Sequence, residues 1–175
     1  MTRRLFLSTL AGALPVLALP DVGVAHPIAV RALEFSHLHT GERLMVDYAR
    51  GSTYLPDGLA AINKVLRDFR TREVHPIDPA LLDQLHALRL ATGTRRPFEV
   101  ISGYRSPVTN AHLRSRSQGV ASGSLHMSGR AIDVRLADVP LATLRDAAYA
   151  LERGGVGYYP GSNFVHLDTG RVRRW

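Results

Sequence analysis

The chain has 175 residues, 45% of them hydrophobic, which is enough for one compact domain around a single core. It contains no cysteine, which excludes disulfides, thiolate metal sites and a cysteine nucleophile. The formal net charge of +7 at pH 7 favours an anionic partner over a cationic one.

The N-terminal segment differs from the rest of the chain and has the three parts of an export signal. The twin arginine Arg3-Arg4 precedes a mostly apolar stretch from Leu5 to Leu19, and small residues then lead to Ala25. The arginine pair favours the Tat route, with cleavage after Ala25. The apolar stretch is shorter than the ~20 residues that a spanning helix needs, and a retained anchor is the alternative. We therefore predict a Tat-type signal at residues 1–25 and a periplasmic domain at residues 26–175.

Export changes which anionic partner is expected. Removing the signal takes away two arginines and one aspartate, a net +1, and leaves a charge of +6. Outside the cytoplasm we expect no nucleic-acid partner, whereas an anionic wall polymer or transient contact with the membrane surface fits the charge. A solvated basic surface without a specific partner is the alternative.

Hydrophobic periodicity predicts an α+β domain in which helices flank a small antiparallel sheet. Alternating apolar residues predict strands at 31–50 (two strands around a turn), 97–105, 130–136, 156–160 and 164–170. Helical spacing predicts helices at 59–70, from Asp78-Pro79 to Gly93, from Pro107 onward and at 141–151. A polar loop is expected at residues 115–125, where it would flank a cleft.

Three side chains on or beside predicted strands form a candidate metal site. Asp133 stands between Ile132 and Val134, where a carboxylate is costly to desolvate unless a cation or hydrogen bonds compensate. His126 and His166 are also near strands, and each alone is consistent with a solvated or core histidine. Together with Asp133 they supply the three protein ligands of a catalytic zinc site, with a fourth position for water.

Two further residues are candidates for catalysis. Asp168 lies two residues after His166, so on a strand both side chains point to one face. Asp168 is either a general base beside a metal-bound water or a support for His166, and the spacing does not choose between these roles. The predicted strand within 97–105 ends at Gly103, and Arg105 just past it is a candidate donor to an oxyanion or a substrate carboxylate, or else a surface arginine. Five other histidines are expected to be structural or solvated, namely His37, His39, His75, His86 and His112.

The motifs resemble a known family. "SLHMSGRAID" resembles the SxHxxGxAxD signature of the DD-peptidase/hedgehog-type zinc peptidases, and "SGYRSP" and "FVHLDTG" resemble the murein endopeptidases of the MepK (YcbK-like) group. The similarity extends over nearly all of residues 26–175. It implies a zinc-dependent peptidase of peptidoglycan stem peptides that hydrolyses cross-links, with zinc held by His126, Asp133 and His166, and with Arg105 aiding transition-state binding.

One position departs from the wider superfamily. Related dipeptidases and carboxypeptidases carry a glutamate base three residues before the last zinc histidine, and this chain has Asn163 there. We predict that Asp168 acts as base in its place. A carboxypeptidase that trims stem peptides, or a zinc-containing protein that binds wall peptides without cutting them, are the alternatives.

Overall fold

The structure is a computed structural model, and it describes residues 29–116 and 121–175. The predicted export signal at residues 1–25 lies outside the described residues, as does part of the predicted polar loop, residues 117–120. Within the described ranges, no helix combines the length and the apolar character that crossing a bilayer requires.

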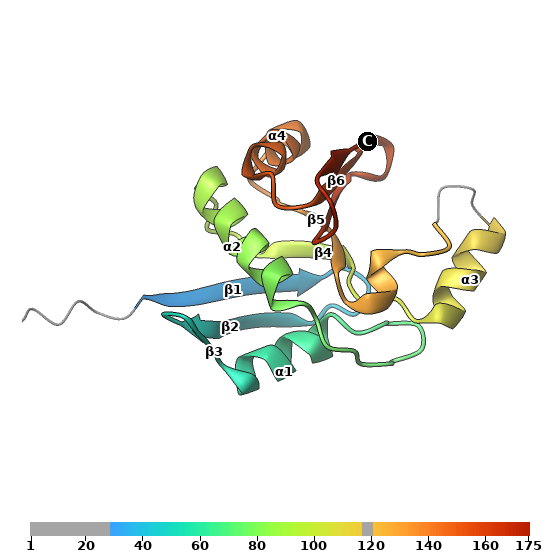
Figure 1. The fold of residues 1–175 in the computed structure, drawn as a ribbon, viewed down its shortest axis with the longest axis horizontal. Helices are drawn as coiled ribbons and strands as arrows, with labels where there is room; N and C mark the ends of the chain where they lie inside the picture. The colour runs from blue at the N-terminus through green and yellow to red at the C-terminus, as the bar shows by residue number, and fades with distance from the viewer. Residues whose placement is uncertain (1–28, 117–120) are drawn as a thin grey trace, which may run out of the picture.

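One open sheet organises the described part of the chain (Figure 1). Its strands are β1 (Val30–His37), β2 (Arg43–Arg50), β3 (Thr53–Tyr54), β4 (Phe98–Ser102), β5 (Ala131–Arg135), β6 (Gly155–Tyr159), β7 (Phe164–Asp168) and β8 (Arg173–Arg174). In space they follow the order β3-β2-β1-β4-β5-β7-β6-β8.

The α+β class is as predicted, but the sheet is mixed. Five neighbouring strand pairs are antiparallel, whereas β1 pairs with β4 and β6 pairs with β8 in parallel. A parallel pair needs a connection that returns the chain to the starting edge. Between β1 and β4 that connection includes two strands and two helices, so local alternation along the sequence could not show the pairing.

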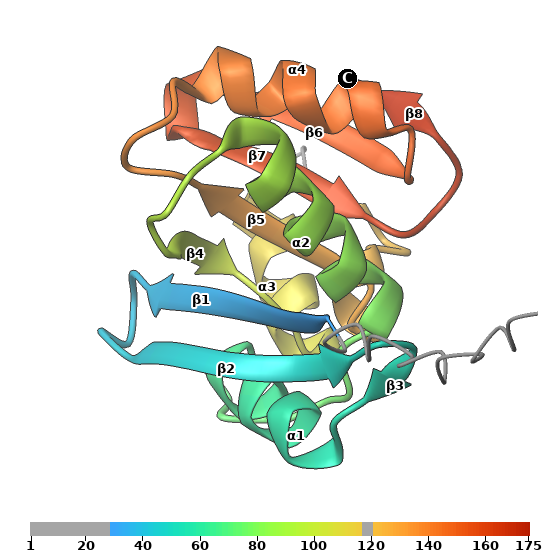
Figure 2. The ribbon, with the colours of Figure 1, turned by 90° about the vertical axis from the view of Figure 1, so that its left-hand side faces the viewer.

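The helices divide between the two faces of the sheet. They are α1 (Pro56–Val65), α2 (Pro79–Thr92), α3 (Pro107–Arg116) and α4 (Leu141–Leu151), with short 3-10 turns η1 (Leu125–Ser128) and η2 (Pro160–Ser162). Figure 2 shows α2 and α4 in front of the sheet and α3 behind it. α1 packs beside β2 at one edge.

The limits predicted for α2 are confirmed. Asp78 accepts a hydrogen bond from the Ala80 amide at 3.0 Å, which caps the first turn, and Pro79 occupies the first helical position. Gly93 ends the helix in the left-handed conformation, with φ 66°. The four predicted core leucines of this helix are fully buried: Leu81, Leu82, Leu85 and Leu88.

The predicted helix at 59–70 is shorter than expected and begins earlier. It ends at Val65 because the next buried carboxylate binds backbone groups instead of continuing the helix. Asp68 accepts hydrogen bonds from the amides of Arg70 at 2.9 Å and Ser106 at 2.8 Å. Aspartate side chains compete in this way with helical backbone pairing.

Candidate metal centre

Two of the three predicted ligands are cross-strand neighbours. In the antiparallel pairing of β5 with β7, Asp133 lies directly opposite His166. Side chains alternate between the faces of a strand, so Ile132 and Leu167 enter the core while Asp133, His166 and Asp168 share the other face. The register of β5 with β7 therefore places Asp133, His166 and Asp168 next to one another.

The third predicted ligand comes from η1, immediately before β5. The ring of His126 is buried, and its Nδ1 lies 2.7 Å from the Gly103 carbonyl oxygen at the end of β4. A carbonyl only accepts, so Nδ1 carries the proton and donates. This bond leaves the lone pair on Nε2, which faces Asp133 and His166.

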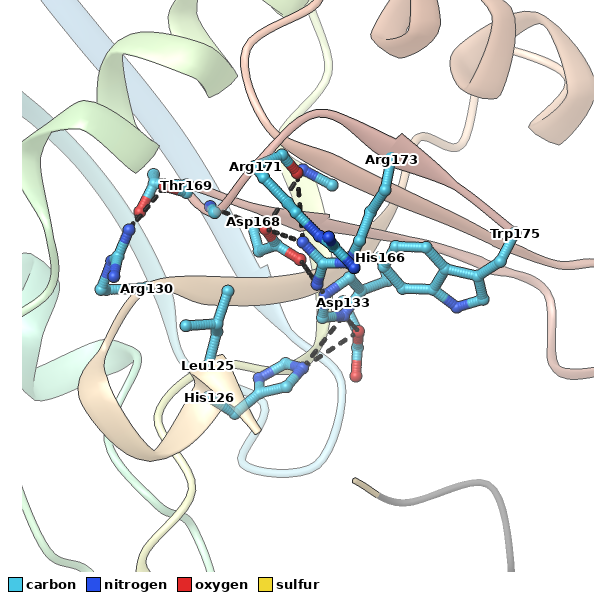
Figure 3. A network of polar contacts seen from close by, with 12 residues as sticks. Leu125, His126, Arg130, Asp133, His166, Asp168, Thr169, Arg171, Arg173 and Trp175 are labelled. Atoms are coloured by element: carbon cyan, nitrogen blue, oxygen red, sulfur yellow. Dashed lines mark hydrogen bonds and ion pairs between the residues drawn. The ribbon is translucent and has the colours of Figure 1, made fainter. Parts of the chain in front are cut away.

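The three donor atoms converge on one point (Figure 3). His126 Nε2 lies 3.2 Å from His166 Nδ1 and 3.3 Å from Asp133 Oδ1, and His166 Nδ1 lies 2.8 Å from Asp133 Oδ1. Ligands bound tetrahedrally at zinc–nitrogen and zinc–oxygen bond lengths stand about 3.3 Å apart. The donor set and its spacing therefore fit a zinc ion.

The electrostatics of the cluster also favour a cation. Burial alone would raise the pKa of Asp133, but the neighbouring His126 and His166 lower it well below its usual range. Burial alone would lower the pKa of His166, but its hydrogen bonds to Asp133 and Asp168 raise it to about 9. The site thus favours an ionised Asp133, whose negative charge a protonated His166 or a metal cation can balance.

Asp168 is placed behind His166. Its Oδ2 lies 3.1 Å from His166 Nε2, the ring nitrogen that points away from the other two predicted ligands. Burial alone would raise the pKa of Asp168, but hydrogen bonds from His166, the Gly170 amide and Arg173 lower it well below its usual range. A carboxylate so placed is a weak proton acceptor, so the contacts favour support of His166 over the base role. The base role stays a prediction.

Arg105 follows β4 and faces the cluster. Its Nη2 lies 3.6 Å from Asp133 Oδ2 and 3.4 Å from Ser102 Oγ. Burial lowers the pKa of Arg105, and the Asp133 carboxylate partly restores it. The guanidinium thus stays a cation beside the metal site, as an oxyanion donor requires.

A cleft of about 500 Å³ opens onto the cluster. His126, Asp133, His166 and Arg105 lie on its wall, together with three aromatic residues: Tyr159, Phe164 and Trp175. The Trp175 ring centroid lies 5.4 Å from that of His166, and its Nε1 donates to the Tyr159 hydroxyl at 2.7 Å. No local sequence pattern connects these aromatic residues to the metal ligands, so the sequence carries no signal for them.

Asn163, which stands where related peptidases carry the glutamate base, lies at the rim of the cleft. Ser162 and Phe164 line the cleft, and Asn163 between them is exposed. Asn163 ends η2 with φ 54°, a conformation that asparagine tolerates better than most residues. Its amide cannot accept a proton as a carboxylate does.

The other histidines within the described ranges take no part in this cluster. Among the described residues, His126, Asp133 and His166 form the one group with metal-ligand spacing. The buried His37 accepts backbone hydrogen bonds in the β1–β2 turn, and His39 stacks on Phe69. These contacts agree with the structural roles expected for them.

The mixed α+β fold, with two histidines and one aspartate beside an open cleft, is that of an M15-type peptidase. A family model described as "Peptidoglycan L,D-endopeptidase MepK" matches residues 26–175.

Curated relatives agree with the family match. The chain is 44% identical to the peptidoglycan L,D-endopeptidase MepK of Escherichia coli K12 over 165 residues, 94% of this chain and 89% of the relative. It is 45% identical to the probable peptidoglycan L,D-endopeptidase MepK of Haemophilus influenzae over 146 residues, 83% of this chain and 78% of the relative. The chain therefore belongs to the MepK family and is a peptidoglycan hydrolase.

Proposed function

We propose that the protein is a zinc-dependent murein endopeptidase that hydrolyses amide bonds in the peptide cross-links of peptidoglycan. The observation that carries the proposal is the convergence of His126, Asp133 and His166, with donor atoms 2.8 to 3.3 Å apart, on the wall of a cleft. The relatives named as L,D-endopeptidases supply the choice of bond, between an L and a D centre.

The residues around the cluster have distinct tasks in this reaction. A zinc ion held by the three ligands would polarise the scissile carbonyl and lower the pKa of a water molecule beside it. Arg105 donates from the cleft wall to the carbonyl oxygen as negative charge develops there. The Gly103 carbonyl and Asp168 orient the rings of His126 and His166 from behind.

Purified protein incubated with defined muropeptide dimers tests this function. We expect dimers to become monomers when zinc is present, with products identified by mass, and a chelator to stop the reaction. His126→Ala is the inactive control. Loss of a single terminal residue from the substrate would instead identify a carboxypeptidase and contradict the endopeptidase assignment.

Asn163 favours one alternative of a different class. Because this position lacks a carboxylate, a protein that holds zinc and binds wall peptide without cutting it is the second candidate. Intact dimers that nevertheless remain bound to the zinc-loaded protein would support this binding function over hydrolysis.

We also propose that the protein acts in the periplasm after export by the Tat route. The support is the twin arginine and the apolar stretch after it, together with a substrate that lies outside the cytoplasm. Replacing both Arg3 and Arg4 by lysine should leave the protein in the cytoplasmic fraction, where wild type is absent. Unchanged periplasmic recovery of this variant would contradict the Tat route.

A further inference from the structure

We infer that Arg173, in the last strand β8, is a positioning residue of the metal site. Acting through Asp168, it fixes which ring nitrogen of His166 faces the metal. The inference rests on the proposed function, since it takes His166 as a metal ligand, but its test measures metal binding rather than turnover.

The Asp168 carboxylate is fully buried and held on both oxygens (Figure 3). Arg173 donates two hydrogen bonds to it, from Nη2 to Oδ2 at 2.6 Å and from Nη1 to Oδ1 at 3.1 Å. The amides of Gly155 and Gly170 donate to Oδ1 at 3.1 and 2.8 Å. A two-point guanidinium contact fixes the plane of a carboxylate as well as its position.

The fixed carboxylate determines the tautomer of His166. Asp168 Oδ2 lies 3.1 Å from His166 Nε2, and a carboxylate paired with an arginine can only accept a hydrogen bond. Nε2 therefore keeps its proton, and Nδ1, 2.8 Å from Asp133 and 3.2 Å from His126, is the nitrogen that gives up its proton and offers its lone pair when a metal binds. Carboxylates behind metal-binding histidines commonly have this orienting role.

The absence of a side chain at Gly155 leaves space for this ion pair. In the parallel register of β6 with β8, Gly155 lies beside Arg173. A Cβ on Gly155 would stand 2.5 Å from Asp168 Oδ2 and 2.6 Å from Arg173 Nη1. The outer side of the guanidinium is covered by the Trp175 ring, whose centroid lies 4.8 Å away.

The next residue provides a matched control. Arg174 lies on the same strand, and its guanidinium stands over the Tyr149 ring at 4.8 Å and 3.7 Å from Glu152. Arg174→Ala therefore removes the same charge and a similar aromatic contact without touching Asp168. Any loss specific to Arg173 then reflects its contact with the carboxylate.

The experiment compares zinc binding by wild type, Arg173→Ala, Arg173→Lys and Arg174→Ala in the full chain. Zinc affinity is measured by competition with a chelator, and histidine nitrogen NMR reports which nitrogen of His166 is metal-bound. We expect Arg173→Ala to weaken zinc binding by about 10- to 100-fold. Arg173→Lys, which keeps the charge but cannot bridge both oxygens, should give a smaller loss, and Arg174→Ala should bind as wild type does.

The rise in melting temperature on zinc addition separates positioning from a purely structural role. If Arg173 positions His166, zinc should raise the melting temperature of Arg173→Ala less than that of wild type, because the gain in stability follows metal affinity. If the metal-free variant melts lower but gains as much from zinc as wild type, the inference is wrong. Wild-type zinc affinity in Arg173→Lys, or binding of zinc through His166 Nε2 in wild type, would also overturn it. Failure of wild type to bind zinc at all would contradict the proposed function instead.

Discussion

At the scale of single residues, Arg105 combines burial with unused hydrogen-bonding capacity. Its Nε is buried without a partner among the described residues, and its Nη2 makes only long contacts, 3.4 Å to Ser102 and 3.6 Å to Asp133. Donors that are desolvated and only weakly paired are costly unless substrate completes them. The Arg105 guanidinium is therefore free to donate hydrogen bonds to the substrate oxygen on which negative charge develops during the reaction.

Arg105→Ala should therefore lower kcat/KM for muropeptide dimers by about 100- to 1,000-fold, the usual effect of losing an oxyanion donor. Zinc affinity should stay close to the wild-type value, because Arg105 is not a ligand. Arg70→Ala is the control, since Arg70 is an exposed arginine whose charge acts on Arg105. An equal loss of zinc from Arg105→Ala would show that the residue maintains the site rather than stabilising the transition state.

At the scale of elements, Asp68 joins the turn after α1 to the loop that carries Arg105. Its Oδ2 accepts from the Ser106 amide at 2.8 Å and its Oδ1 from the Arg70 amide at 2.9 Å. Burial alone would raise the pKa of Asp68, but hydrogen bonds from Thr109, Ser106 and the Arg70 amide lower it to about 2. The ionised carboxylate is thus part of what fixes the start of α3.

Asp68→Asn should lower the free energy of unfolding by about 1.5 to 3 kcal/mol near neutral pH, because an amide replaces a charged acceptor. The folded pKa of Asp68 is depressed, so its stabilisation is complete above the ordinary value of 3.8 and is lost as pH falls through about 2. The difference between wild type and variant, measured by denaturant unfolding across acid pH, should shrink over that interval. A difference that stays constant down to pH 2 would contradict the role of the ionised form, and the exposed Asp57→Asn is the control.

Much of the site could be predicted from sequence because its key residues lie within two local patterns. Alternation in "RAIDV" and "FVHLD" put Asp133, His166 and Asp168 on strand faces. The signature glycine is required by its own backbone conformation, since Gly129 has φ 66°, and also by close packing, since a Cβ there would stand 2.1 Å from the Pro76 carbonyl oxygen. Backbone geometry of this kind leaves a trace in the sequence.

The contribution of the C-terminal strand left no such trace. Arg173 reaches Asp168 because β8 pairs in parallel with β6. A strand of only two residues has too short an alternating pattern to be predicted from sequence. The early end of α1 is similar, since it depends on contacts between Asp68 and Ser106, which lies far along the chain. The sequence therefore did not predict the strand that carries Arg173 or the end of the helix before Asp68, because both depend on contacts with distant parts of the chain.

At the scale of the whole molecule, the basic charge fits the polymer on which the family acts. The residues after the predicted signal carry a net charge of +6, from the total of +7 less two arginines and one aspartate. Peptidoglycan stem peptides carry carboxylates, so an intact wall presents many negative charges to one bound protein. Attraction of this kind acts over a Debye length of about 8 Å at physiological salt and is screened as salt rises.

We therefore expect KM on intact wall sacculi to rise several-fold between about 0.05 and about 0.5 M salt, while kcat changes little. A short soluble muropeptide dimer, which meets only the cleft, should show a much weaker dependence. Initial rates on both substrates over the same salt series make the comparison. An equal salt effect on both would place the attraction in the cleft, at Arg105, rather than on the surface as a whole. A KM on sacculi that does not change with salt concentration would show that the net charge has no part in wall binding.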